Sequence, residues 1–232
     1  MQFFFIVLIF CLILFLYRLY HLANDDYVLV KKNITLEEIF NCVLVCAFVA
    51  LFFARLFHVL FDPQPVFLNP LGFLLFPYFP GLSLIGGLIG GSLALFVYAR
   101  VKKFPVGRVF DFFTVSFIFI LPFGVLGYFL FSQDVSRGGL VLFGLFTLMQ
   151  IGTNIYLFPK ARSLEIKDGT ISILFLIFFS LSMLLAIAID HPGTNYFVNH
   201  RINLILLFML ITGIILIVKQ EITGRLKIKN GK

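Results

Sequence analysis

The sequence lacks tryptophan, contains only three cysteines, and is poor in charge, since Asp, Glu, Lys and Arg make up 12% of its 232 residues. Without tryptophan, the usual aromatic belt of a membrane protein is not expected. Cys11, Cys42 and Cys46 fall in apolar segments, which favours small buried hydrophobic residues over disulfides or metal ligands. No metal-ligand spacing, P-loop or dinucleotide-binding fingerprint occurs, so the sequence predicts no metal and no cofactor.

Hydrophobic residues are abundant instead. They make up 61% of the chain, with 33 phenylalanines, and the mean hydropathy is +1.07. Apolar runs long enough to cross a membrane recur from one end of the chain to the other. The composition excludes a soluble domain around a buried core and predicts an all-α, polytopic membrane protein with a single domain over residues 1–232.

We expect seven membrane-spanning helices, separated by short polar connections. Thr35 and Glu38 have the spacing of a capping box that opens the second helix. Residues 62–81 contain five prolines and neither Lys nor Arg, which predicts an interfacial or re-entrant loop between the second and third helices. The first run has no basic residue before it, so we interpret it as a span and not as a signal peptide. The expected spans are 2–17, 35–61, 82–100, 109–131, 140–158, 170–189 and 203–218.

The basic residues orient these spans. All but three of the 18 lysines and arginines fall in one set of alternate loops and the C-terminal tail. The exceptions are Arg137 and Arg201, in the other loops, and Arg55, inside a span. By the positive-inside rule the N-terminus lies outside and the C-terminus is cytoplasmic. The net charge of +7 is then explained by orientation and contact with anionic lipid, and a nucleic-acid partner is not needed.

The third expected span is rich in glycine. Gly86, Gly87, Gly90 and Gly91 form two overlapping G-x-x-x-G pairs, and Ser83 extends the same small face. Each glycine inside a helix costs about 1 kcal/mol relative to alanine, so four of them require an explanation. Tight packing against another helix is the first interpretation, and close approach of a lipid head group is the second.

Two polar residues near the end of the second helix are candidates for chemistry. Arg55 is an intramembrane arginine, which suggests a functional site, although its side chain could instead reach out to the interface. His58 follows one turn later on the same face and is a candidate base or phosphate partner, or a packed polar tip. Asp111 falls in the first turn of the expected fourth helix, where a carboxylate favours the helix N-terminus.

From Thr35 to Phe131 the sequence resembles the bacterial prolipoprotein diacylglyceryl transferases. The resemblance includes the seven-span pattern with the N-terminus outside. The matching segments are EEIF (37–40), ARLFHVLF (54–61), LSLIGGLIGG (82–91), YARVKK (98–103), FPVGRVFDF (104–112) and the glycine-containing stretch 124–129.

The resemblance implies a bacterial inner-membrane transferase of lipoprotein biosynthesis. Such an enzyme moves a diacylglyceryl group from phosphatidylglycerol to the cysteine thiol of a lipoprotein signal peptide. Several signature positions differ, among them the family's histidine, arginine and first asparagine, which correspond to Ile85, Val125 and Tyr128. The remaining candidates are Arg55, Ser83 and the four glycines for lipid binding and His58 for the base.

Two functions are open at this point, and a transporter is the least favoured third, because the spans lack the intramembrane carboxylates that ion coupling usually needs. The chain is either a divergent transferase or a catalytically inactive family member that binds a phospholipid or a helical partner. The expected partners are phospholipid and, for the transferase, lipoprotein signal peptides.

Overall fold

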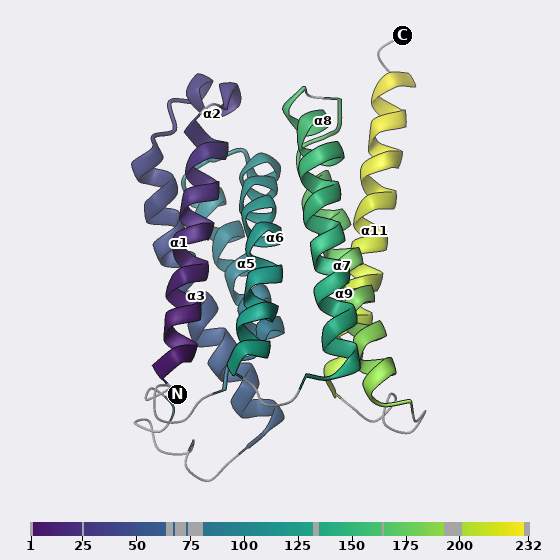
Figure 1. Ribbon diagram of the computed structural model, residues 1–232. Helices are drawn as coiled ribbons and strands as arrows, with labels where there is room; N and C mark the ends of the chain where they lie inside the picture. The colour runs from purple at the N-terminus through teal and green to yellow at the C-terminus, as the bar shows by residue number, and fades with distance from the viewer. Residues whose placement is uncertain are drawn as a thin grey trace. The chain divides into compact units, whose positions relative to one another are not determined.

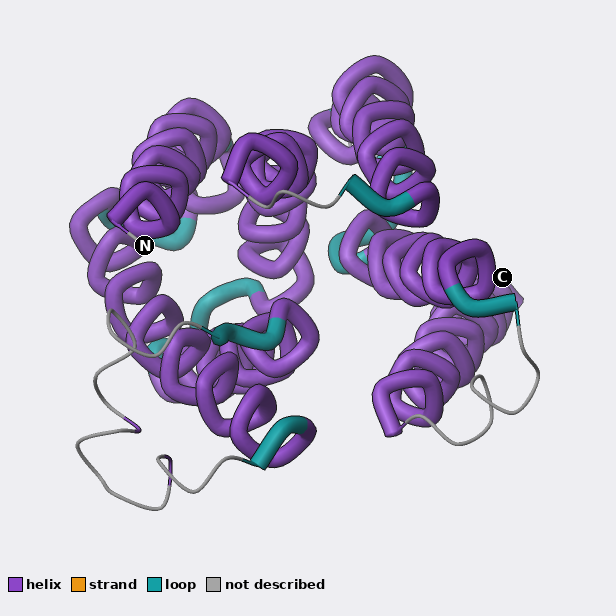
Figure 2. Tube along the Cα trace, turned by 60° about the horizontal axis from the view of Figure 1, so that its bottom comes forward, coloured by secondary structure: helices purple, strands orange, loops and turns teal. Residues whose placement is uncertain are grey.

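A computed structural model describes residues 2–24, 26–63, 67, 73, 81–131, 135–163, 165–192 and 201–229. Within these ranges the chain is helical and contains no strand (Figure 2). Of the proline-rich segment predicted to lie at the interface, only residues 62, 63, 67, 73 and 81 are described. Its predicted form therefore lies outside the described residues.

The described helices include seven that are long and apolar enough to cross a membrane, which confirms the predicted all-α, seven-span protein. One span, Arg137–Arg162, consists of α7, a π-helical turn and α8 in succession. The elements are α1 (Gln2–Asn24), α2 (Tyr27–Lys31), α3 (Leu36–Phe61), α5 (Leu84–Val101), α6 (Val106–Phe131), α7 (Arg137–Gly152), the π-helical turn (Thr153–Leu157), α8 (Phe158–Arg162), α9 (Thr170–Asp190) and α11 (Arg201–Lys229).

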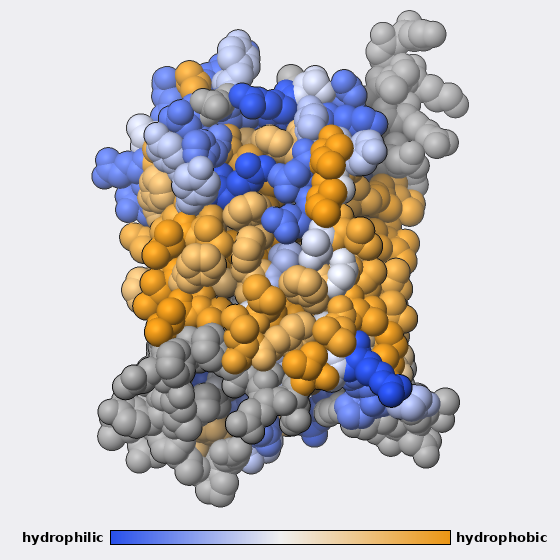
Figure 3. All heavy atoms as spheres, viewed as in Figure 1, coloured by the Kyte–Doolittle hydropathy of each residue, from blue (hydrophilic) through white to orange (hydrophobic). Residues whose placement is uncertain are grey.

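The helices form two compact units, Met1–Phe112 and Phe113–Lys232, and α6 contributes to both. In each unit, the side visible in Figure 3 has hydrophobic residues along the middle of the helices and hydrophilic residues near their ends. This distribution is that of helices with a hydrocarbon environment around their central turns. The single domain expected over residues 1–232 stays a prediction.

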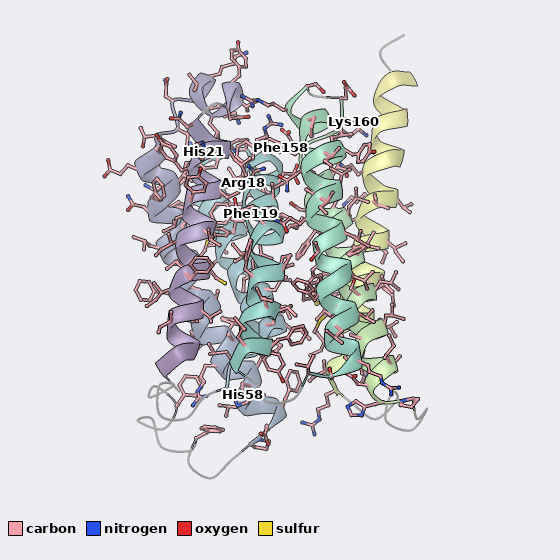
Figure 4. All side chains as sticks on the ribbon, viewed as in Figure 1. Arg18, His21, His58, Phe119, Phe158 and Lys160 are labelled. Atoms are coloured by element: carbon pink, nitrogen blue, oxygen red, sulfur yellow. The ribbon has the colours of Figure 1, made fainter. Side chains whose placement is uncertain are left out.

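In the first unit, successive helices run in opposite directions (Figure 1). α1 leads up to α2, α3 returns, and α5 runs back alongside α3, against which it packs extensively. Arg18 and His21 lie toward one end of the unit and His58 lies at the other (Figure 4). Because α3 and α5 run in opposite directions, their C-terminal ends lie at opposite ends of the first unit (Figure 1).

Local sequence signals explain where these helices begin. At the start of α3, the Glu38 amide donates to Thr35 Oγ1 and the Thr35 amide donates to Glu38 Oε2, both at 3.2 Å. The predicted capping box is confirmed. The α6 helix begins at Val106, earlier than expected, so Asp111 is not in its first turn. The predicted position of Asp111 at the helix N-terminus is wrong, and the residue is buried, with 3% of its surface exposed.

The second unit is organised around α9, which packs against α7 and α11. The rings of Phe146 and Phe179 stack between α7 and α9 with centroids 5.9 Å apart. The Asp190 carboxylate, at the end of α9, accepts a hydrogen bond of 2.7 Å from the Gly138 amide in the first turn of α7. This bond satisfies one of the amides that a helix N-terminus leaves without an intrahelical partner, and it joins the two helices.

The fifth span extends beyond the expected end at 158 and passes through Pro159. A proline within a helix cannot donate to the carbonyl four residues earlier, and its ring presses against that carbonyl. Here the preceding turn widens, and the Phe158 amide donates to the Thr153 carbonyl five residues back. The π-helical turn lets the chain continue to Arg162, whereas the sequence pattern predicted a loop from Pro159 onward.

Candidate functional site

Arg55 lies near the end of α3 and is 2% exposed. Its Nε donates to the Phe73 carbonyl at 3.1 Å and its Nη1 donates to the Gly81 carbonyl at 2.9 Å. The guanidinium also lies 4.6 Å from the centre of the Phe67 ring. The side chain therefore turns toward the protein, and its partners are Phe67, Phe73 and Gly81, which lie between α3 and α5 in the chain.

His58 lies one turn beyond Arg55 and contacts the same connecting segment. Its ring stands 6.0 Å from the ring of Phe67, measured between centroids. Its imidazole also occupies the space that a side chain at Gly81 would need. Gly81 has a φ of +149°, a conformation that glycine adopts readily and other residues rarely do. Glycine at this position thus permits both the turn into α5 and the approach of the histidine.

The start of α5 is attached to α3 beside this pair. The Ser83 amide donates to the Ala54 carbonyl at 2.9 Å. The Ser83 hydroxyl accepts from the Gly86 amide at 3.2 Å and caps α5. The structure therefore brings Ser83, Arg55 and His58 to one end of the α3–α5 pair.

The glycine face of α5, defined as Gly86, Gly87, Gly90 and Gly91, faces α3. A methyl group on Gly86 would lie 2.6 Å from the Phe53 carbonyl oxygen, and one on Gly90 would meet the Phe53 side chain. Gly87 and Gly91 are less crowded, because a methyl group there would lie 3.5 Å and 3.4 Å, respectively, from the nearest atom of α3. Helix packing therefore accounts for this face, as the first interpretation proposed. Its role in lipid binding stays a prediction.

The positions at which the sequence departs from the family signature differ in their surroundings. Ile85 is 4% exposed within α5, whereas Tyr128 on α6 is 62% exposed. Val125, on the same helix as Tyr128, is half-buried. The first unit therefore has a packed aliphatic side chain where the family's histidine is expected. Of the two histidines in this unit, His21 and His58, His58 is the closer to Ile85 along the chain.

Sequence reasoning missed a buried ion pair in the first unit. Arg108 donates to the Asp26 carboxylate through Nη2 at 2.6 Å and Nε at 3.1 Å, and both side chains are 4% exposed. Asp26 also accepts from the amides of Val28 and Leu29, both at 3.0 Å, as the cap of α2. The sequence signal was present as an aspartate just before a short helix, but nothing in the sequence linked it to an arginine 82 residues later.

The described residues contain no group of three His, Cys, Asp or Glu side chains suited to a metal ion. Cys42 and Cys46 are buried one turn apart in α3 with their sulfurs 3.9 Å from each other. The arrangement at the other end of α3 offers a fixed positive charge and an imidazole next to a helix N-terminus. Chemically, such a group can hold an anion and exchange a proton.

Seven spanning helices with a buried cation and an imidazole near the end of one span define a polytopic membrane protein with a polar site at the edge of its hydrophobic region. Comparison with protein families matches residues 2–215 to prolipoprotein diacylglyceryl transferase. The chain belongs to this family. A search of curated proteins finds no match. The match extends over nearly all the spans, whereas the sequence motifs that carry the resemblance lie mainly between Thr35 and Phe131.

Proposed function

We propose that this protein is a divergent diacylglyceryl transferase that uses phosphatidylglycerol as donor and the cysteine of a lipoprotein signal peptide as acceptor. Family membership supports the reaction class. The observation that carries the proposal to particular residues is the pairing of Arg55 and His58 at one end of α3, both in contact with the segment that leads into α5.

In this proposal His58 accepts the proton of the cysteine thiol. The resulting thiolate forms a C–S bond with the glycerol carbon that carries the phosphate ester, and the C–O bond to the phosphate breaks. Glycerol phosphate leaves with the electron pair, so the product is a thioether. A well-placed general base accelerates such a step by about 10²–10⁴-fold, which makes the role of His58 measurable.

Arg55 acts on the phosphate in this proposal. Its Nε donates to the Phe73 carbonyl and its Nη1 donates to the Gly81 carbonyl. These bonds fix the position of the charge beside the N-terminus of α5, where backbone amides favour an anion. Preorganised positive charge of this kind stabilises the leaving phosphate more than a mobile side chain does.

The test is an assay of the purified protein with labelled phosphatidylglycerol and a signal peptide that carries the cysteine. The expected product is a thioether-linked diacylglyceryl peptide, and a Cys→Ser peptide should give none. His58→Ala should lower the rate at least about 100-fold. The matched control is His21→Ala, because His21 is exposed and lies at the opposite end of the first unit (Figure 4).

Arg55→Lys tests the phosphate contact while it keeps the charge. Lysine cannot reproduce the forked geometry that joins two carbonyls, so a rate loss with a retained helical spectrum is expected. Arg100→Lys is the control, since Arg100 is exposed on α5. Absence of product with the unmodified protein, under conditions in which an active family member works, would refute the transferase proposal. An unchanged rate for His58→Ala would refute its role as base.

A second function is favoured by one observation, the buried Ile85 at the position of the family's histidine. In this alternative the protein binds a phospholipid or a helical partner and does no chemistry. It predicts that phospholipid co-purifies with the protein and that His58→Ala leaves the bound amount unchanged. In the transferase assay no product would form from any peptide.

The proposed location is the bacterial inner membrane, with the N-terminus outside and the C-terminus in the cytoplasm. The charge distribution supports this orientation, because the lysines and arginines gather in alternate connections. It would place Arg55 and His58 at the outer leaflet. Attaching a reporter that requires the cytoplasm to each terminus tests the orientation directly.

A further inference from the structure

A groove of about 460 Å³ opens on the second unit, between the span that contains α7 and the neighbouring helix α9. Its lining includes Met149 and Leu157 on one side and Ile171 and Leu181 on the other. The eleven positions from Ile171 to Leu181 rise about 15 Å along a helix. That length equals about one leaflet of the hydrocarbon core.

The interior of the groove is apolar and partly formed by the π-helical turn. Thr153, Ile171 and Phe175 line it and are buried at 6% exposure or less. Gly152 also lines it, and a side chain built there would find no heavy atom within 4 Å. The widened turn and the adjacent glycine therefore leave space beside α9. A regular helix with larger side chains would fill part of this space.

Basic residues stand at one end of this groove. Lys160 and Arg162, in the last turn of α8, are exposed and follow the groove residue Tyr156 by four and six positions. Figure 4 shows Lys160 at the end of the span, beyond Phe158. Lys167 donates to the Gln220 carbonyl at 2.8 Å. The connection also contains two acidic residues, Glu165 and Asp168, so its three basic residues leave an excess of one positive charge.

We propose that this groove binds an anionic phospholipid, with an acyl chain in the groove and the phosphate at Lys160 and Arg162. The groove is apolar and about as long as one leaflet is thick, which suits an acyl chain. The basic residues at its end suit the phosphate of the head group. Basic pockets between spanning helices are a known way of holding anionic head groups. In the predicted orientation the lipid belongs to the cytoplasmic leaflet. All the residues involved belong to the second unit, so the proposal does not depend on the transferase activity.

The absence of tryptophan from the chain provides a direct test. Tyr156→Trp places a single fluorophore in the groove lining, and Leu148→Trp places one on α7 at a position that is 65% exposed and outside the lining. Each protein is reconstituted in phosphatidylcholine bilayers with a rising fraction of phosphatidylserine that carries brominated acyl chains. Bromine quenches tryptophan on contact. Phosphatidylserine is anionic but lacks the glycerol head group of the proposed donor.

In Tyr156→Trp, we expect the fraction of contacts with brominated lipid, measured from the quenching, to exceed the mole fraction of phosphatidylserine in the bilayer. The expected preference for phosphatidylserine is about fivefold or more, because one basic residue near the surface contributes about that factor. At Leu148→Trp the quenching should follow the mole fraction. Adding Lys160→Gln and Arg162→Gln to Tyr156→Trp should remove the preference. Adding Lys102→Gln and Lys103→Gln, which changes the net charge equally, should retain it.

A second pair of variants tests the groove itself. Gly152→Leu fills it, whereas Gly144→Leu adds the same side chain to α7 at a position that also faces open space but lies outside the lining. On the Tyr156→Trp background, the first should reduce selective quenching and the second should not. Equal quenching at Tyr156→Trp and Leu148→Trp would overturn the proposal. A preference that survives loss of both basic residues would overturn the assignment of the head-group site.

Discussion

Two adjacent glycines of α5 should differ clearly in their response to the same substitution. In Gly86→Ala the new methyl would lie 2.6 Å from the Phe53 carbonyl oxygen and 2.6 Å from Phe57 Cβ, both on α3. In Gly87→Ala the nearest atom is Ala54 Cβ, at 3.5 Å, an ordinary contact. Neither neighbour of Gly86 is the mobile end of a side chain, so α3 and α5 must move apart to accept the methyl group.

The size of the difference follows from two terms. Replacing glycine by alanine within a helix gains about 1 kcal/mol in both variants, so this term cancels when the two are compared. Overpacking of a tight contact costs about 1–3 kcal/mol, and it applies only to Gly86→Ala. We therefore expect Gly86→Ala to be less stable than Gly87→Ala by about 1–3 kcal/mol, with Gly87→Ala equal to or more stable than the parent.

The measurement is the free energy of unfolding in detergent micelles, followed by the helical circular dichroism signal. Gly90→Ala and Gly91→Ala form an independent repeat, because a methyl group at Gly90 would overlap the Phe53 side chain, whereas one at Gly91 would lie 3.4 Å from Ala50 Cβ. Equal stabilities within each pair would show that α5 does not pack on α3 through this face. The argument from packing would then be refuted.

Two further predictions concern polar contacts. Asp26→Asn or Arg108→Met should each destabilise the first unit by about 3–5 kcal/mol, because each leaves part of a buried ion pair behind, and the double variant should lose less than the sum of the two in the same unfolding measurement. Asp190→Ala should cost about 1–3 kcal/mol by leaving the Gly138 amide without its acceptor, whereas Asp190→Asn, which keeps an oxygen, should cost less. Equal losses for Asn and Ala at Asp190 would contradict that account.

The spans could be predicted from the sequence because each depends on a local property. A run of apolar residues identifies a membrane helix without knowledge of its neighbours. Capping is equally local, as Thr35 and Glu38 show. The continuation of the helix through Pro159 could not be predicted in this way. Whether a helix continues past a proline depends on whether the preceding turn can widen, and the proline alone indicates only that the regular hydrogen-bond pattern must change.

The candidate site was only partly predictable. The spacing of Arg55 and His58 correctly put both on one helical face, but it did not indicate that Gly81 and the carbonyls of the next segment would meet them. The pair of Asp26 and Arg108 illustrates the same limit, because its partners are distant in sequence and come together only through tertiary structure. Local patterns thus identified polar residues in unusual places, and packing determined their partners.

The packing of α5 on α3 also decides which substitutions can report on ligand binding. Arg55 and His58 are held by the segment that enters α5, so any change that separates the two helices also displaces the proposed catalytic pair. Lost activity in Gly86→Ala would therefore carry no information about a lipid contact. Gly87 accepts a methyl group without moving α3. If Gly87→Ala remains as stable as the parent but loses phospholipid, the glycine face must contact the lipid as well as the neighbouring helix.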